Sequence, residues 1–217
     1  MTRTPDILCI GSVLWDIIGR CDLPMVAGDD KPGHIARVPG GVALNIAMTL
    51  ERLGRSPALV SVVGADAAGR DLVAACTALG LECGALLVDP ELPTDQYMAI
   101  EAEGRLIAAL ADARSLEAAG DRILAPLCDG RLATPAAPWA GPVALDGNLT
   151  RALLSEIADS PLFAAADLRV APASPGKAER LRPLIGHPRA TIYVNRVEAG
   201  LLTGTRPANA AAAAEAL

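Results

Sequence analysis

The sequence of 217 residues has few aromatic residues and no concentration of positive charge. Aromatic residues make up 2% of the chain, and no block of Lys and Arg stands out against a net charge of −6. Proteins that bind nucleic acid usually carry a basic patch, and those that bind single strands add aromatic rings for base stacking. The sequence therefore argues against nucleic acid as a partner. A small metabolite remains compatible with it, because backbone amides can bind phosphate without net positive charge.

The chain is also poor in residues that bind transition metals. Its two histidines, His34 and His187, are far apart in the sequence. No pair of its five cysteines has Cys-x-x-Cys spacing: Cys9, Cys21, Cys76, Cys83 and Cys128. These spacings predict no zinc site. They favour reduced, buried thiols in a cytosolic protein.

Long hydrophobic runs are absent as well. The N-terminal residues lack an apolar segment followed by a cleavage site, and no apolar run approaches the length that spans a bilayer. We therefore expect a cytoplasmic protein with no membrane contact. Hydrophobic residues nevertheless form 52% of the sequence, which is enough for a well-buried core in one sizeable domain.

Short apolar runs alternate with segments of helical periodicity along most of the chain. Strands are expected at residues 7–10, 58–63, 143–145, 168–171 and 191–194. Helices are expected at residues 41–53, 69–79, 151–158, 176–185, 197–202 and 209–217. This alternation predicts an α/β fold with a mostly parallel sheet.

Two segments interrupt the alternation. Residues 95–112 are mostly extended around Glu103-Gly104, a pattern that predicts a hairpin. Residues 20–38 are rich in Gly, Pro and Asp and show no helical period. We expect these two segments to form a small β layer that is inserted in a single domain spanning residues 1–217.

Polar side chains follow the ends of several predicted strands, where open parallel sheets bind their ligands. Asp16 follows the first strand, Asp146 and Asn148 follow the third, and Asn195 and Glu198 follow the fifth. Any one of them could be an ordinary helix cap or turn residue. The set suits a polyhydroxyl ligand, because each Asp can accept two hydroxyl donors and Asn can both donate and accept.

Glycine-rich segments add one candidate site and exclude two others. Gly40-Gly41 precedes a predicted helix that carries Asn45, and would let a ligand approach the backbone amides. The segment 64–69 has Asp66 where a dinucleotide-binding motif has its second glycine, and this carboxylate would oppose a pyrophosphate. Gly176-Lys177 is followed by alanine rather than the Ser or Thr of a P-loop.

These segments together resemble the PfkB family of carbohydrate kinases. The likeness lies in residues 7–16, in 39–47 with its Gly-Gly-x-x-x-Asn element, in 63–69 and in 195–198 with its Asn-x-x-Glu element. It covers essentially the whole chain. It implies a ribokinase-like, Rossmann-type three-layer sandwich with a small β lid, formed by segments at about 20–38 and 95–112, that closes over the sugar.

The resemblance also implies an activity and the roles of particular residues. The activity is the phosphorylation of a sugar or nucleoside hydroxyl with ATP and Mg²⁺, and homodimers can form through the lid. Substrate binding is expected at Asp16, Gly40, Gly41 and Asn45. Asn195 and Glu198 are expected to order the phosphates and the metal without direct metal binding. Further site candidates are Asp146, Asn148 and Lys177.

Within the family, three segments are most similar to pseudouridine kinases: residues 94–112, 146–149 and 173–178. The Gly-Ala-Gly-Asp signature that supplies the family's catalytic base is not among the 217 residues. We therefore expect the base to lie beyond Leu217 and the chain by itself to be inactive. Two alternatives stay open: a non-catalytic remnant that binds a sugar or nucleoside, and a sugar kinase of the ribokinase or fructokinase type.

Overall fold

A parallel sheet of five strands forms the centre of the computed structural model, which describes residues 4–217. Its strand order is β11-β10-β9-β1-β4, and every neighbouring pair is parallel. The strands are β1 (Ile7–Ile10), β4 (Pro57–Val60), β9 (Pro142–Asp146), β10 (Asp167–Ala171) and β11 (Ala190–Ile192). All five lie at or near their predicted positions, so the predicted α/β fold is confirmed.

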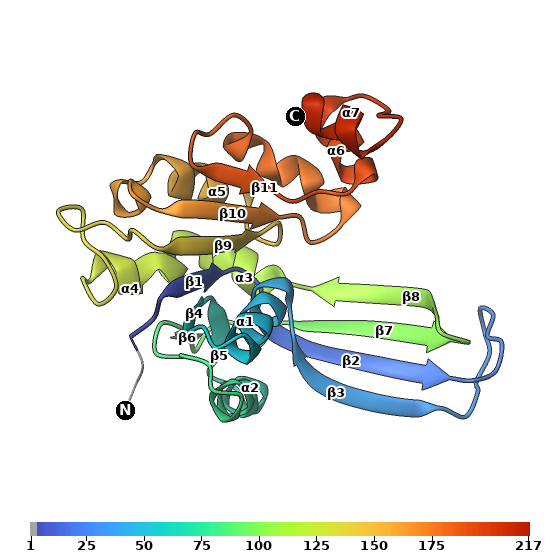
Figure 1. The fold of residues 1–217 in the computed structure, drawn as a ribbon. Coiled ribbons are helices and arrows are strands. Elements are labelled where there is room, and N and C mark those ends of the chain that lie inside the picture. The colour runs from blue at the N-terminus through green and yellow to red at the C-terminus, as the bar shows by residue number, and fades with distance from the viewer. Residues whose placement is uncertain (1–3) are drawn as a thin grey trace.

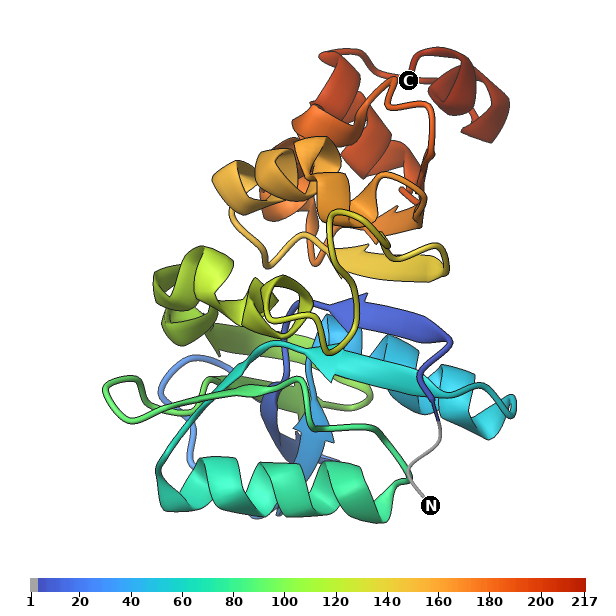
Figure 2. The same ribbon diagram turned by 90° about the vertical axis from the view of Figure 1, so that its left-hand side faces the viewer.

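Both faces of this sheet are buried, which produces three layers (Figures 1 and 2). Successive residues of β1 point into different cores: Leu8 and Ile10 into one, Ile7 and Cys9 into the other. The helices α1 (Val42–Arg52) and α2 (Ala67–Ala78) pack on the side of Ile7. The opposite side is covered by α3 (Arg114–Ala119), α5 (Arg151–Asp159) and the 3₁₀ segment η3 (Pro175–Leu184). Strands buried on both faces read as continuous apolar runs, as this sequence does.

The remaining helical elements are short. They are η1 (Gly120–Leu124), α4 (Ala125–Cys128), η2 (Pro161–Phe163), α6 (Arg196–Thr203) and α7 (Ala210–Glu215). The helix expected at 176–185 is a 3₁₀ segment, η3, with Pro183 inside it. A proline lacks the N–H that an α-helical turn needs, and it disfavours regular helix around it. The helices α3 and α4 were not predicted.

The prediction of a single strand at 58–63 is wrong, because this segment forms two strands. It breaks at Ser61 into β4 and β5 (Val62–Gly64), and β5 pairs with β6 (Leu87–Asp89) in a separate parallel sheet. All residues from 57 to 64 are buried. Uniform burial gives no signal of where a strand changes its partner, so hydrophobicity alone could not locate the break.

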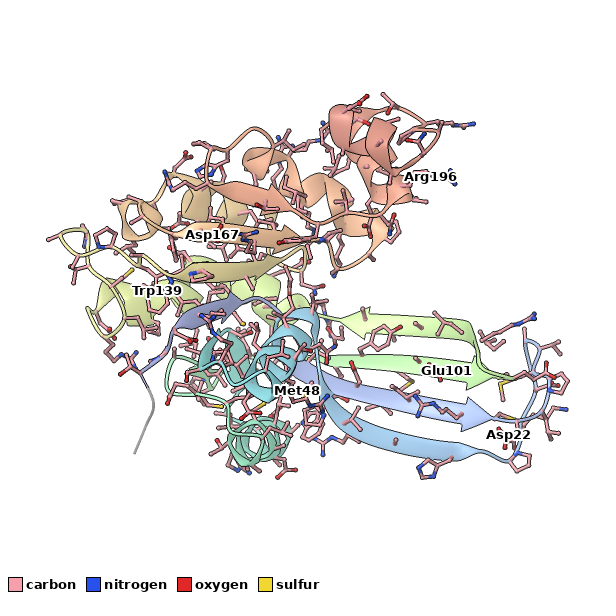
Figure 3. All side chains as sticks on the ribbon, in the orientation of Figure 1. Asp22, Met48, Glu101, Trp139, Asp167 and Arg196 are labelled. Carbon is pink, nitrogen blue, oxygen red and sulfur yellow. The ribbon has the colours of Figure 1, made fainter. Side chains whose placement is uncertain are left out.

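A second sheet of four strands extends from the carboxyl ends of the main strands (Figure 1). Its order is β3-β2-β7-β8, with β2 (Leu14–Cys21), β3 (His34–Gly40), β7 (Gln96–Ala102) and β8 (Arg105–Asp112). Glu103 and Gly104 both have positive φ, 49° and 72°, as a type I′ hairpin turn requires. The far end of this sheet, where Asp22 and Glu101 are labelled, lies well away from the main sheet (Figure 3). Both predicted β segments therefore contribute strands, and β2 begins earlier than the segment at 20–38.

The cysteines are free, although not all of them are buried. Cys9, Cys21 and Cys76 are buried, Cys83 is partly buried and Cys128 is exposed. None of the helices in residues 4–217 combines the length and the hydrophobicity of a membrane-spanning helix.

Candidate functional site

A cavity of about 310 Å³ lies between the carboxyl ends of the main strands and the second sheet. This volume is at the small end of the range typical of small-molecule sites. The cavity is lined by Ser12, Leu14, Asp16, Gly41, Val42, Asn45, Tyr97, Ala111, Ala113, Asn148, Ala173, Ser174 and Lys177. It therefore brings together five residues singled out in the sequence: Asp16, Gly41, Asn45, Asn148 and Lys177.

Asp16 lies on β2 with its carboxylate in this cavity. The side chain is half-buried, and among residues 4–217 its carboxylate has no hydrogen-bond or ion-pair partner. Burial raises the pKa of Asp16 because the charged form loses hydration. An unpaired, partly desolvated carboxylate in a cavity is suited to accept hydrogen bonds from ligand hydroxyls.

The glycines at the start of α1 allow protein groups to pack closely. Gly41 has φ of 99°, and a Cβ atom there would clash with the Ser12 carbonyl group. The first amides of the helix are already bonded: Val42 N–H donates to Ser12 Oγ at 2.8 Å and Ala43 N–H to Asp146 Oδ2 at 3.0 Å. These amides are occupied by protein oxygens, so Asp16 and Asn45 are the better-placed ligand groups at this end of the cavity.

Asp146 is a buried junction between loops and does not line the cavity. Its side chain is 0% exposed. Oδ2 accepts hydrogen bonds from Ser12 N–H (2.8 Å), Ser12 Oγ–H (3.0 Å) and Ala43 N–H, and Oδ1 accepts one from Asn148 N–H (2.7 Å). Burial raises the pKa of Asp146, and these hydrogen bonds oppose the rise. Asp146 thus joins the ends of β1 and β9 to the start of α1.

Asn148 and Lys177 form a polar wall of the cavity. Lys177 Nζ donates to Asn148 Oδ1 at 2.7 Å, and Asn148 Nδ2 donates to Ser12 Oγ at 2.9 Å. Burial lowers the pKa of Lys177, and the nearby guanidinium of Arg180 adds to this effect. Lys177 keeps N–H donors beyond the one used by Asn148, because an ammonium carries three.

Asn195 and Glu198 lie outside the cavity lining and form the capping box of α6. Asn195 Oδ1 accepts from the N–H groups of Val197 and Glu198, and Glu198 Oε2 accepts from Asn195 N–H at 2.8 Å. Their oxygens are thus directed at helix amides. Across residues 4–217, no group of three or more His, Cys, Asp or Glu side chains could hold a metal ion. Asn195 and Glu198 therefore do not by themselves build a magnesium site.

The carboxylate of Asp66 has a structural role. It caps α2 by accepting Gly69 N–H at 2.7 Å, and it also accepts Thr94 Oγ1–H at 2.6 Å and Thr94 N–H at 3.0 Å. A carboxylate in this position occupies the helix start that a dinucleotide phosphate would need.

Sequence reasoning assigned no site role to three residues that line the cavity: Ser12, Tyr97 and Ala111. Ser12 lies two residues after the end of β1, at the sheet edge where ligand-binding residues were expected. The strand register brings Tyr97 beside Asp16 and Ala111 beside Tyr97. Such cross-strand neighbours require the pairing of β2 with β7, which the local sequence does not specify.

Comparisons with known proteins identify the family. Residues 4–217 match the family described as pfkB family carbohydrate kinase. The chain is 29% identical over 203 residues to the pseudouridine kinase of Escherichia coli, which covers 91% of this chain and 61% of that protein.

Solved structures agree with this result. A carbohydrate kinase from Agrobacterium tumefaciens superposes with a TM-score of 0.76 at 25% identity, over 98% of this chain and 67% of that one. The Arabidopsis thaliana ribokinase solved with ribose and ATP has a TM-score of 0.71 at 16% identity, over 99% and 67% of the two chains, and supports the fold. The three-layer fold is therefore ribokinase-like, and the chain belongs to the pfkB family of carbohydrate kinases.

Proposed function

We propose that the chain holds a sugar or nucleoside in the cavity at Asp16, as the acceptor for phosphate from ATP. The observation that carries this proposal is the unpartnered carboxylate of Asp16 in a cavity that also exposes Asn45 and Lys177. Asp16 would accept hydrogen bonds from two ligand hydroxyls, and Asn45 would add a donor and an acceptor. Gly40 and Gly41 would contribute indirectly, by allowing the start of α1 to pack closely against Asp16 and Ser12.

The chemistry that the family performs relies on positioning. Phosphoryl transfer needs an aligned acceptor and neutralised phosphate charge, and the protein makes few covalent contributions. The cavity residues supply the alignment of the acceptor hydroxyl. By family resemblance, Asn195 and Glu198 would help to order the phosphates of ATP, a role additional to their capping box.

Pseudouridine is the proposed acceptor, with pseudouridine 5′-phosphate as the product. Support comes from the likeness of residues 94–112 to pseudouridine kinases and from the 29% identity to the E. coli enzyme. Thr94, one of the residues that carry this likeness, also has a role in the fold. Its Oγ1 donates a hydrogen bond to Asp66 and accepts one from Gly64 N–H. A ribokinase-type or fructokinase-type substrate is the alternative.

The second sheet offers a surface for pairing with a second copy of the chain. Ile35, Met98, Ile100 and Leu110 are 39–74% exposed. They lie on the face opposite Asp16. Met98 pairs with Ile17, both Ile35 and Ile100 pair with Gly19, and Leu110 pairs with Met98. We propose a homodimer through this face, in the cytoplasm. Sedimentation should show concentration-dependent dimers that Leu110→Lys weakens, whereas a monomer at every concentration would contradict it.

An assay of ATP consumption tests the kinase proposal. The 217-residue chain and the product of the gene's whole reading frame should be assayed with pseudouridine, ribose, fructose and adenosine. Without a Gly-Ala-Gly-Asp sequence, the 217 residues should bind the acceptor and transfer little phosphate, since a positioned base contributes about 10²–10⁴-fold. Turnover by neither protein, with ligand binding retained, would favour a non-catalytic binding protein.

A further inference from the structure

We infer that the cavity between Tyr97 and Ala111 holds a planar aromatic ring of the ligand, stacked on Tyr97, and that Tyr97 thereby selects nucleosides over free sugars. This inference rests on the proposed function, because it assumes that the sugar of the ligand is held at Asp16. It assigns a second part of the cavity to the base.

The register of the second sheet places the two parts side by side. Asp16 on β2 is the direct partner of Tyr97 on β7, and Tyr97 is the direct partner of Ala111 on β8. Directly paired residues point to the same face of a sheet, and neighbouring strands lie about 4.8 Å apart. The base of a nucleoside is bonded directly to its sugar. A sugar at Asp16 therefore brings its base over the next strand, where Tyr97 lies.

Tyr97 is the only aromatic residue among the described residues that line the cavity. Its hydroxyl group has no hydrogen-bond partner among residues 4–217. The other aromatic side chains have contacts within the protein: Trp15 with Ala68, Trp139 with Pro142, Tyr193 with Arg169, and Phe163 in the core. Of the aromatic rings in residues 4–217, that of Tyr97 is thus the one that lines the cavity beside Asp16.

Ala111 provides the space that such a ring needs. It is exposed in the cavity, and its side chain is a single methyl group. A larger residue beside Tyr97 would occupy the area next to the ring. A tyrosine next to an alanine therefore gives a flat apolar surface with room above it, and aromatic rings stack on each other favourably.

Calorimetric titration with pseudouridine and with ribose tests the inference. Tyr97→Ala should weaken the binding of pseudouridine about tenfold and that of ribose less than twofold, because only pseudouridine has a base to stack. Tyr97→Phe should retain the affinity for pseudouridine within about twofold, since it keeps the ring. Ala111→Phe should weaken pseudouridine about tenfold and spare ribose. Tyr193→Ala, which alters an exposed tyrosine away from the cavity, is the matched control.

The outcomes separate this inference from the proposed function. Equal losses for both ligands in Tyr97→Ala, or an unchanged affinity for pseudouridine, would overturn the role of Tyr97 and leave the sugar site intact. Binding of ribose without pseudouridine by the unmodified chain would have the same meaning. Binding of neither ligand would overturn the proposed function and this inference together.

Discussion

The carboxylate of Asp16 lies directly against the Cα atom of Gly40, so that a Cβ atom at position 40 would overlap its oxygens. Gly40 is the last residue of β3 and leads into α1, and its φ is not in the positive region. Backbone conformation therefore does not require a glycine at this position. The requirement is steric: the helix start and the acidic side chain are fitted to each other.

Gly40→Ala should therefore displace the Asp16 side chain from its position. We expect ligand affinity to fall about tenfold, which corresponds to about 1.4 kcal/mol. Gly19→Ala in the same sheet is the control, because a Cβ atom there meets only the Ala99 carbonyl at 3.8 Å. Calorimetry with pseudouridine and ribose measures both variants. If Gly40→Ala binds as tightly as Gly19→Ala, the Asp16 carboxylate makes room for the added Cβ atom without loss of ligand binding, and the steric requirement at position 40 is contradicted.

Ligand binding should depend on pH through Asp16. Burial raises the pKa of Asp16, so it takes up a proton at a higher pH than an exposed aspartate does. Affinity should decrease as the pH falls through this raised pKa, because a protonated carboxyl accepts fewer hydrogen bonds. The dissociation constant should therefore rise as the pH is lowered from about 8 to about 4, and Asp16→Asn should abolish this rise.

The same pKa shift acts on stability with the opposite trend. The folded chain holds the Asp16 proton at pH values where the unfolded chain has lost it. The contribution of Asp16 to the free energy of unfolding therefore falls as pH rises from the ordinary aspartate pKa through the raised one. Urea unfolding of the wild type, relative to Asp16→Asn, should show this relative decline. An increase over that range would contradict the assigned direction.

Asp146→Ala should destabilise the fold strongly. The change leaves the buried donors of Ser12, Ala43 and Asn148 without their acceptor, and each unsatisfied buried group costs about 1–3 kcal/mol. We expect a loss of at least about 3 kcal/mol in the free energy of unfolding, measured in urea. Asp22→Ala, at an exposed aspartate, should change it by less than about 0.5 kcal/mol. A loss of less than about 1 kcal/mol in the free energy of unfolding for Asp146→Ala would contradict the role of Asp146 as a junction.

The hairpin of β7 and β8 should behave as a mobile lid. All residues of β8 except Asp112 are exposed, and β8 is an edge strand. Segments with few buried contacts open easily. Hydrogen exchange of residues 96–112 should be fast in the free chain and slower with bound pseudouridine or ribose. Equal protection in both states would show that the hairpin does not close over the ligand.

The alternation of buried strands and amphipathic helices was predictable because each element carries its own local pattern. The hairpin turn was predictable for the same reason, since Glu103-Gly104 specifies it locally. The break at Ser61 and the neighbourhood of Tyr97 depend on which strands pair, and no local pattern records that choice. Asp146 looked like a ligand residue in the sequence, because burial by distant loops cannot be seen there. The Asn-x-x-Glu pattern of Asn195 and Glu198 matches both a helix capping box and the family motif, so the sequence alone could not separate the two roles.

The most direct test of the account is calorimetric titration of the chain and of Asp16→Asn with pseudouridine, ribose, fructose and adenosine. The substitution keeps the shape of Asp16 and removes its charge, and loss of charge-assisted hydrogen bonds should cost about 1.5–3 kcal/mol of binding. Asp22→Asn, at the far end of the second sheet, should bind as the wild type does. We predict that the wild type binds at least one of these ligands and that Asp16→Asn binds it more weakly by this amount. Unchanged affinity in Asp16→Asn, or no binding of any sugar or nucleoside by the wild type, would contradict the assignment of the cavity as the acceptor site.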